Sequence, residues 1–197
     1  MKKIEFGDIK NILEYEKIRD AFRNHLIVLK KNRRIQVGDL ISFLFENRET
    51  VLFQIQEMMR AERIVEDAKI QEEIDVYNAL IPDKGELSAT MFIEIDEKNK
   101  IKEELDRMMG IDQEGTVYFK IGEQENVPGF FEAGHSKEDK ISAVHYVRFR
   151  FTPEQIEKFK NEQEEVFLVI DHPNYRQRKE VPLEVRRELI KDLLEEE

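Results

Sequence analysis

The sequence contains no cysteine and no tryptophan. Without thiols the chain cannot form disulfides, ligate zinc or iron–sulfur clusters through sulfur, or use a cysteine nucleophile. A redox role would need a cofactor held by other groups, and no cofactor is predicted. The chain also lacks both a basic start followed by an apolar run and any apolar stretch of about eighteen residues. Neither a secretion signal nor a membrane span is expected, and the expected location is the cytoplasm.

Glycine and proline are scarce, with eight and five copies in 197 residues. The glycines are too dispersed to form a phosphate-binding loop. The serines lack the glycine-flanked context of a nucleophile elbow. These absences argue against the common nucleotide-binding and serine-hydrolase classes. Because the sequence has no internal repeat and no Gly/Ser linker, residues 1–197 are predicted to form a single domain.

Charged residues are abundant. They make up 38% of the chain, hydrophobic residues make up 40%, and the net charge is −11. The apolar fraction is sufficient for a packed core. An acidic surface repels nucleic acids and anionic lipids, so neither a nucleic-acid nor a membrane partner is expected. The composition does not indicate an oligomeric state.

Apolar periodicity divides the chain into two parts. Residues 1–82 are predicted to be mainly helical, because apolar side chains recur every three or four positions. Residues 83–197 show short alternating runs and are predicted to mix strands with short helices. The predicted helices are 9–31, 47–67, 69–80, 101–108, 153–161 and 183–194, and the predicted strands are 35–46 (kinked, or a hairpin), 89–95, 117–121, 127–131, 141–151 and 165–170. The fold class is therefore α+β, a helical N-terminal lobe packed on a mainly antiparallel sheet, and the C-terminal order fits a ferredoxin-like arrangement.

Several segments resemble a bacterial family of proteins of unknown function, whose members are often encoded beside rubrerythrin and an iron–sulfur oxidoreductase. They are FENRET at 45–50, FQIQEM at 53–58, YNALIP at 77–82, GELSAT at 85–90, ISAV at 141–144 and DHPNY at 171–175. The resemblance implies an accessory protein that binds a redox partner, rubrerythrin-like or iron–sulfur, in peroxide defence or electron transfer. This is the leading functional hypothesis. Whether the chain is an enzyme is left open.

Each of the three N-terminal helices carries a charged residue within its apolar stripe. Arg19, Glu62 and Glu73 are therefore predicted to face the core, where isolated charges would cost several kcal/mol. One interpretation is a structural ion network in which Arg19 bridges the two carboxylates. A second is a ligand-binding or catalytic pocket, with Arg19 as the anion clamp and a glutamate as acid or base. The third is a carboxylate metal site, although neither helix that carries a glutamate has the Glu-x-x-His pair of di-iron bundles, and no metal ligand is assigned.

The histidines give a weaker signal. His145 alternates with apolar residues of a predicted strand, so it is a core imidazole or, alternatively, a ligand-binding residue. His25, His135 and His172 match no metal-ligand spacing.

A single basic run, Lys30, Lys31, Arg33 and Arg34, follows the first predicted helix. Cations at a helix C-terminus relieve the helix dipole, which is the simpler explanation. The alternative is a patch for an acidic partner or for RNA, but no aromatic residue lies within the run to stack on a base.

Overall fold

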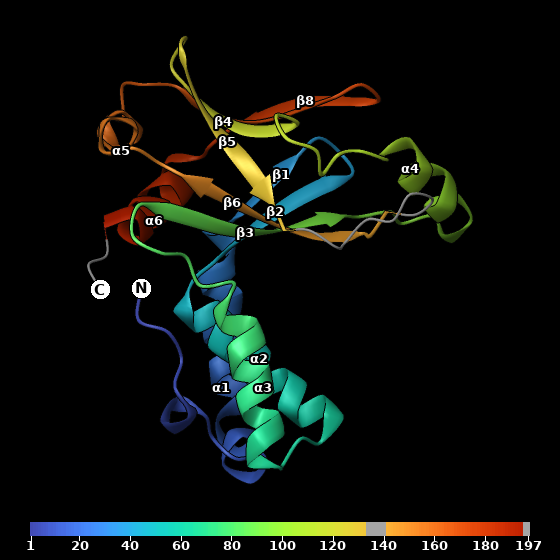
Figure 1. Ribbon diagram of the computed structural model, residues 1–197, viewed down its shortest axis with the longest axis vertical. Helices are drawn as coiled ribbons and strands as arrows, with labels where there is room; N and C mark the ends of the chain where they lie inside the picture. Colours follow the sequence, from blue (N-terminus) through green and yellow to red (C-terminus); the bar gives the residue numbers. More distant parts are fainter. Residues whose placement is uncertain (133–140, 195–197) are drawn as a thin grey trace.

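The computed structural model describes residues 1–132 and 141–194, which form a helical lobe projecting from a strongly curved sheet (Figure 1). The helical lobe consists of a 3₁₀ turn, η1 (Phe6–Asp8), and three helices, α1 (Ile12–Lys31), α2 (Arg48–Glu62) and α3 (Asp67–Asn78). The sheet lobe adds η2 (Lys98–Lys100), α4 (Ile101–Arg107), α5 (Pro153–Lys160) and α6 (Leu183–Leu194). None of the helices in these described ranges is long and apolar enough to cross a bilayer.

The helix boundaries follow local capping chemistry. Asn11 caps α1 by accepting a hydrogen bond from the backbone of Glu14 at 3.0 Å. Asn47 and Thr50 form a reciprocal capping box at the start of α2. At the other end of α2, Arg63 adopts a left-handed conformation with φ of 53°, which ends the helix several residues before the predicted limit at 67. Thr152 and Gln155 form a second reciprocal capping box at the start of α5, which agrees with the helix predicted for 153–161.

Eight strands form one sheet with the order β1-β2-β3-β6-β5-β4-β7-β8, and every pair of neighbours is antiparallel. The strands are β1 (Arg34–Val37), β2 (Ile41–Glu46), β3 (Glu86–Ile93), β4 (Val117–Ile121), β5 (Glu125–Phe131), β6 (Val144–Arg150), β7 (Val166–His172) and β8 (Tyr175–Glu180). The outer strands β1 and β8 contact each other, so the sheet nearly closes into a barrel. The α+β class is confirmed, but this single eight-stranded sheet differs from the ferredoxin-like arrangement predicted for the C-terminal part.

Tyr175 joins the two outer strands of the sheet. Its hydroxyl donates to the carbonyl of Val37 at 2.8 Å and accepts from the backbone N–H of Leu40 at 3.0 Å. Gly38, in the turn between β1 and β2, has φ of 73°, and a Cβ at this position would lie 2.2 Å from the tyrosine oxygen. Only glycine therefore satisfies both the turn and the approach of Tyr175. Of the two arrangements predicted for residues 35–46, a kinked strand or a hairpin, the structure has the hairpin.

The interior of the curved sheet is a phenylalanine-rich core. Phe119 contacts several other rings at centroid distances from 4.7 to 5.8 Å, namely those of Phe45, Phe149, Phe151 and Phe159. In β4 and β7 only alternate side chains are buried, whereas β2 is buried on both faces and β3 nearly so. The difference follows from coverage, because α2 of the helical lobe contacts β2 and α6 contacts β3.

Candidate functional site

A cleft of about 620 Å³ lies where the helical lobe meets the outer face of the sheet. The N-terminal segment and α3 form one wall, and β3, β5 and β6 form the other. Junctions between packed lobes are common positions for small-molecule sites, and this volume is in the range of such sites. We call this hollow the lobe cleft.

A buried carboxylate binds two of the guanidinium groups that line the lobe cleft. Glu86 of β3 is 3% exposed and accepts hydrogen bonds from Arg148, from Arg150 Nε at 3.0 Å and from the backbone N–H of Asp83 at 3.2 Å. Antiparallel register puts Arg150 directly opposite Glu86, with Arg148 two residues along the same strand. Two positive charges therefore share one negative charge here.

The two arginines differ in how far they are engaged. Arg148 also donates to the carbonyl of Ala79, just after α3, and so joins the sheet to the helical lobe. The Arg150 side chain is 74% exposed, and its two Nη atoms have no partner among the described residues. Arg150 is thus held at Nε, while its remaining donors point into the cleft region and are available to a ligand.

The N-terminal segment closes one side of the lobe cleft. Asn78 exchanges two hydrogen bonds with the backbone of Ile4, at 2.8 and 2.9 Å. Lys3 donates to the carbonyl of Ile81 at 2.7 Å and forms an ion pair with Asp83 at 3.2 Å. These contacts fix the segment against α3, so the wall is held by both backbone and side-chain hydrogen bonds.

Aromatic side chains line the sheet wall of the lobe cleft. Phe130 is 44% exposed, and Tyr146 is half-buried. Burial raises the pKa of Tyr146, and the nearby Tyr77 and Glu46 add to this effect. At neutral pH the tyrosine is therefore a neutral hydroxyl that can donate a hydrogen bond.

Glu46 lies buried beside the lobe cleft and has hydroxyl partners. Its carboxylate accepts from Thr50 at 2.5 Å and from Thr90 at 2.6 Å, and the residue is 2% exposed. Thr90 is directly opposite Tyr146 in the β3–β6 ladder. The segments 45–50, 77–82 and 85–90, which carry the family resemblance, thus converge at this junction.

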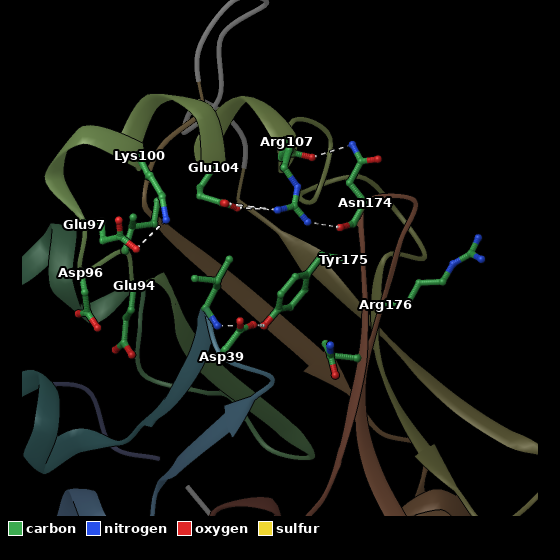
Figure 2. Close-up of a pocket in the computed structure, with 13 residues that line it drawn as sticks. Asp39, Glu94, Asp96, Glu97, Lys100, Glu104, Arg107, Asn174, Tyr175 and Arg176 are labelled. Carbon is green, nitrogen blue, oxygen red and sulfur yellow. Dashed lines mark hydrogen bonds and ion pairs between the residues drawn. The ribbon is translucent and has the colours of Figure 1, made fainter.

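A second hollow of about 550 Å³ lies between α4 and the turns that precede β2 and β8 (Figure 2). Its lysine and one of its arginines have carboxylate partners within the hollow, Lys100 with Glu97 at 2.7 Å and Arg107 with Glu104 at 3.0 Å. Arg107 also exchanges hydrogen bonds with Asn174 at 3.1 and 2.9 Å. These bonds tie α4 to the β7–β8 hairpin, and we interpret them as structural. Arg176 also lines this hollow, but the lobe cleft lies at the junction of the two lobes and has the exposed ring of Phe130 on its wall, so it is the better candidate site.

The described residues contain no group of three or more histidine, aspartate or glutamate side chains placed to hold a metal ion. The metal interpretation of the sequence therefore has no geometric basis in 1–132 and 141–194. The ligand chemistry of the lobe cleft is instead that of charged and aromatic hydrogen-bonding groups.

The structure does not bring together the three charges predicted to meet in the helical lobe. Arg19 is half-buried, but its partner is Glu57, bound through Nε at 2.7 Å and Nη2 at 2.8 Å. Glu62 is exposed at the end of α2, and Glu73 is half-buried on α3. The prediction of a joint Arg19–Glu62–Glu73 centre is wrong because helical phase gives the direction of a side chain but not which residue of a neighbouring helix lies opposite.

His145 is 1% exposed, and its Nε2 lies 2.8 Å from the carbonyl of Ser142. Phe131 packs edge-on against its ring at 6.0 Å. The imidazole is thus part of the core. His172 is similarly buried and bonded to the Met109 carbonyl at 2.9 Å, whereas His25 forms an exposed pair with Glu49 and His135 lies outside the described residues.

The basic run does not form one exposed patch. Arg33 is 1% exposed and pairs with the buried Asp192 of α6, while Arg34 pairs with Glu94 at 3.0 Å. Lys30 lies over the ring of Phe53 at 5.4 Å, and Lys31 is exposed. The prediction of a four-residue binding patch is corrected accordingly, because the chain turns directly from α1 into β1 and buries Arg33 between the lobes.

Sequence patterns did not single out the residues of the lobe cleft. Alternation along β6 places Arg148 and Arg150 on the other face of the strand from His145 and Val147. The sequence therefore indicates that the two arginines lie on one face. Their partner Glu86 starts the next-paired strand, 62 residues away from Arg148. Only the strand register reveals that the three groups meet.

The fold and the site define an α+β protein. Its helical lobe lies on one side of a nearly closed antiparallel sheet, and a charged cleft lies at the junction of the helical lobe and the sheet. A family model described as "Protein of unknown function (DUF3501)" matches residues 3–193, and the chain belongs to this family. It is also similar to a crystal structure titled as a novel protein of unknown function from Burkholderia pseudomallei K96243. The identity is 28%, the TM-score is 0.89, and the match covers 98% of this chain and 100% of the other. No curated protein matches.

Proposed function

We propose that the protein binds a small organic anion in the lobe cleft, with the anionic group on Arg150 and an apolar or aromatic body against Phe130 and Tyr146. The observation that carries this proposal is the sharing of Glu86 by two guanidinium groups. Arg150 is the exposed member of the pair, and although Asp75 and Glu132 also line the cleft, its Nη atoms place exposed cationic donors on the sheet wall.

The geometry suits binding of a carboxylate or phosphate monoester. A guanidinium presents parallel N–H donors that match two oxygens of either group. Because Nε of Arg150 is already fixed by Glu86, less side-chain freedom is lost when the Nη atoms bind.

Calorimetric titration with benzoate, phenyl phosphate, hexanoate and inorganic phosphate at low salt tests the proposal. We expect the two aromatic anions to bind most tightly. Arg150→Gln should weaken them by about tenfold or more, because it removes a charge-assisted hydrogen-bonded pair worth about 1.5–3 kcal/mol. Phe130→Ala should weaken benzoate and leave inorganic phosphate unchanged.

Arg176→Gln is the matched control. Arg176 is similarly exposed (73%) and also paired through Nε to a carboxylate, Asp171, but lies on β8 away from the lobe cleft. Equal affinities for Arg150→Gln and Arg176→Gln, or no binding of any of the four anions, would refute the proposed function.

The accessory role beside a redox protein stays a prediction that rests on the sequence resemblance. A pull-down with purified rubrerythrin tests it directly. Absence of complex formation at micromolar concentrations would remove it without affecting the ligand proposal.

A further inference from the structure

The lobe cleft is lined by charged side chains of both signs. Among the described residues its cations are Lys3, Arg148 and Arg150, and its carboxylates are Asp75, Asp83 and Glu132. The buried Glu86 adds a further negative charge behind the two arginines. This balance favours a ligand that carries a positive group in addition to the anionic group placed on Arg150.

Asp75 is a carboxylate of the helical wall that has no cationic partner. Its Oδ1 accepts a hydrogen bond from Gln71 at 2.8 Å, one turn earlier on α3, and no lysine or arginine in the described part of the chain pairs with it. Asp83 differs, because Lys3 already pairs with it at 3.2 Å. The Asp75 residue is also exposed. Its carboxylate is therefore available to a cationic group of a ligand.

Asp75 and Arg150 lie at different levels of the lobe cleft. Asp75 shares one face of α3 with Asn78 and Ala79, which follow it by three and four residues. Arg148 donates to the carbonyl of Ala79, so this bond marks the point where the end of α3 meets β6. From that point Asp75 lies roughly 6 Å back along α3, and Arg150 lies roughly 7 Å further along β6. A cation on Asp75 and an anion on Arg150 therefore belong to separate ends of a ligand.

The ring of Phe130 lies at the level of this meeting point. Phe130 is directly opposite Arg148 in the β5–β6 ladder and is 44% exposed. An apolar or aromatic body packed on the ring can extend an anionic group towards Arg150 and an ammonium towards Asp75. Two kinds of molecule share this plan, namely ω-amino carboxylates and short peptides. An α-amino acid does not, because both of its charged groups are attached to one carbon atom.

We propose that the lobe cleft selects a ligand with an ammonium and an anionic group at opposite ends of an apolar or aromatic body, and that Asp75 binds the ammonium. This inference rests on the proposed function. It adds the second charged contact and narrows the ligand class from organic anions in general to ω-amino carboxylates and short peptides.

Calorimetric titration at low salt with 4-(aminomethyl)benzoate and 4-(hydroxymethyl)benzoate tests the inference, because these probes are similar in size and differ in the ammonium. We expect the amine to bind about twofold to fivefold more tightly, the range for an ion pair that stays partly in water. This preference should shrink with added salt. Tighter binding of phenylalanine than of 3-phenylpropionate would overturn the separation of the two charges.

A second pair of probes, glycylphenylalanine and its N-acetyl derivative, distinguishes the two kinds of ligand. A preference for the free amine in the peptide pair alone assigns the site to short peptides. A preference in the benzoate pair alone assigns it to ω-amino carboxylates. Either result supports the shared chemistry, and a preference in neither pair overturns the inference.

Asp75→Asn should abolish the preference for the ammonium without weakening 4-(hydroxymethyl)benzoate. Asparagine keeps the acceptor for Gln71, and exposed substitutions of this kind rarely disturb a fold. Asp67→Asn is the matched control. It removes a carboxylate from the same helix, but Asp67 lies roughly 12 Å further from the sheet and lines a different hollow. The preference should persist in this variant.

These titrations separate the inference from the proposed function. Weakening of every probe by Arg150→Gln, without any preference for the ammonium in the wild type, would leave the anion site standing and overturn the role of Asp75. A preference that persists in Asp75→Asn, or that is lost equally in Asp67→Asn, would also overturn that role. Failure of all the probes to bind would refute the proposed function and this inference with it.

Discussion

At the residue scale, the buried ion pair between Arg33 and Asp192 joins the end of α1 to the C-terminal helix. The two side chains are 1% and 7% exposed, and Arg33 also donates to the carbonyls of Phe45 at 2.8 Å and Glu46 at 3.2 Å. The guanidinium therefore satisfies both a carboxylate and the end of β2. Removal of either partner leaves a desolvated charge without compensation.

We expect Arg33→Met and Asp192→Leu each to lower the free energy of unfolding by about 3–5 kcal/mol, as for other broken buried pairs. The double variant should lose clearly less free energy of unfolding than the sum of the two single losses, because neither charge is left buried without its partner. Arg33→Met should be the more damaging single change, since two carbonyls also lose their donor. Urea unfolding followed by far-UV circular dichroism measures these values.

Lys191→Met is the control for this pair, because Lys191 is exposed and is paired with Glu188 of its own helix. Its effect should stay within about 0.5 kcal/mol. Strict additivity of the two buried substitutions would contradict the pair as described.

The contacts of individual side chains were harder to predict from the sequence than the helices and strands. The helical phase correctly gave Arg19 an inward direction, but its partner Glu57 could be found only once the offset between α1 and α2 was known. Glu62 lies in line with the apolar stripe of α2, but it is the last residue of the helix and is exposed. Burial can be inferred from helical phase only where a neighbouring element packs over that face of the helix. This condition is not met at the end of α2.

At the element scale, Glu57 links α1 to α2. It accepts both Arg19 hydrogen bonds and one from the hydroxyl of Tyr15 at 2.8 Å. The Arg19 hydrogen bonds, together with that of Tyr15, hold the pKa of Glu57 below its ordinary value of 4.5. Because the folded-state pKa is depressed, the contribution to stability is complete above about pH 4.5 and is lost as the pH falls through the lower, folded-state value.

We therefore expect Glu57→Gln to lower the free energy of unfolding by about 1–3 kcal/mol at pH 7. This difference from the wild type should shrink as the pH is lowered below 4.5. Glu62→Gln on the same helix is the control and should have little effect at either pH, because Glu62 is exposed. Chemical unfolding at a series of pH values measures this difference. An increase, as the pH falls, in the free energy of unfolding that Glu57→Gln loses relative to the wild type would contradict the prediction.

Helices and strands with a periodic pattern of apolar residues could be predicted from the sequence. Strand β8 has no such pattern and was not predicted. Apolar residues at every third or fourth position located the larger helices, and alternation located the strands that have one buried row of side chains. In β8, however, only Tyr175 is buried and the following residues are exposed and polar. That strand is held by its ladder with β7 and by the bond of Tyr175 to the β1–β2 turn, and neither leaves an alternating pattern. Because β8 was not predicted, its contact with β1, which nearly closes the sheet, could not be predicted either.

At the scale of the whole molecule, the lobes have separate apolar clusters, one inside the sheet and one among α2, α3 and the N-terminal segment. The chain nevertheless passes between them repeatedly, since α1 leads into β1, β2 into α2, and α3 into β3. Arg148 and Arg33 add buried or half-buried links between the lobes. Neither lobe can lose its structure without breaking these links, so we predict one cooperative unfolding transition.

The absence of tryptophan allows this prediction to be tested with lobe-specific probes. Phe22→Trp places a reporter on α1, where Phe22 packs edge-on against Phe53 at 5.5 Å, and Phe167→Trp places one on the sheet. We expect the two fluorescence transitions to coincide with each other and with circular dichroism, and the calorimetric and van't Hoff enthalpies to agree. In an Arg148→Met background the midpoint should fall while the transitions stay coincident, because Arg33–Asp192 and the chain crossings still couple the lobes. Separate midpoints for the two reporters in the unmodified background would show two independently unfolding units and refute the single-domain prediction.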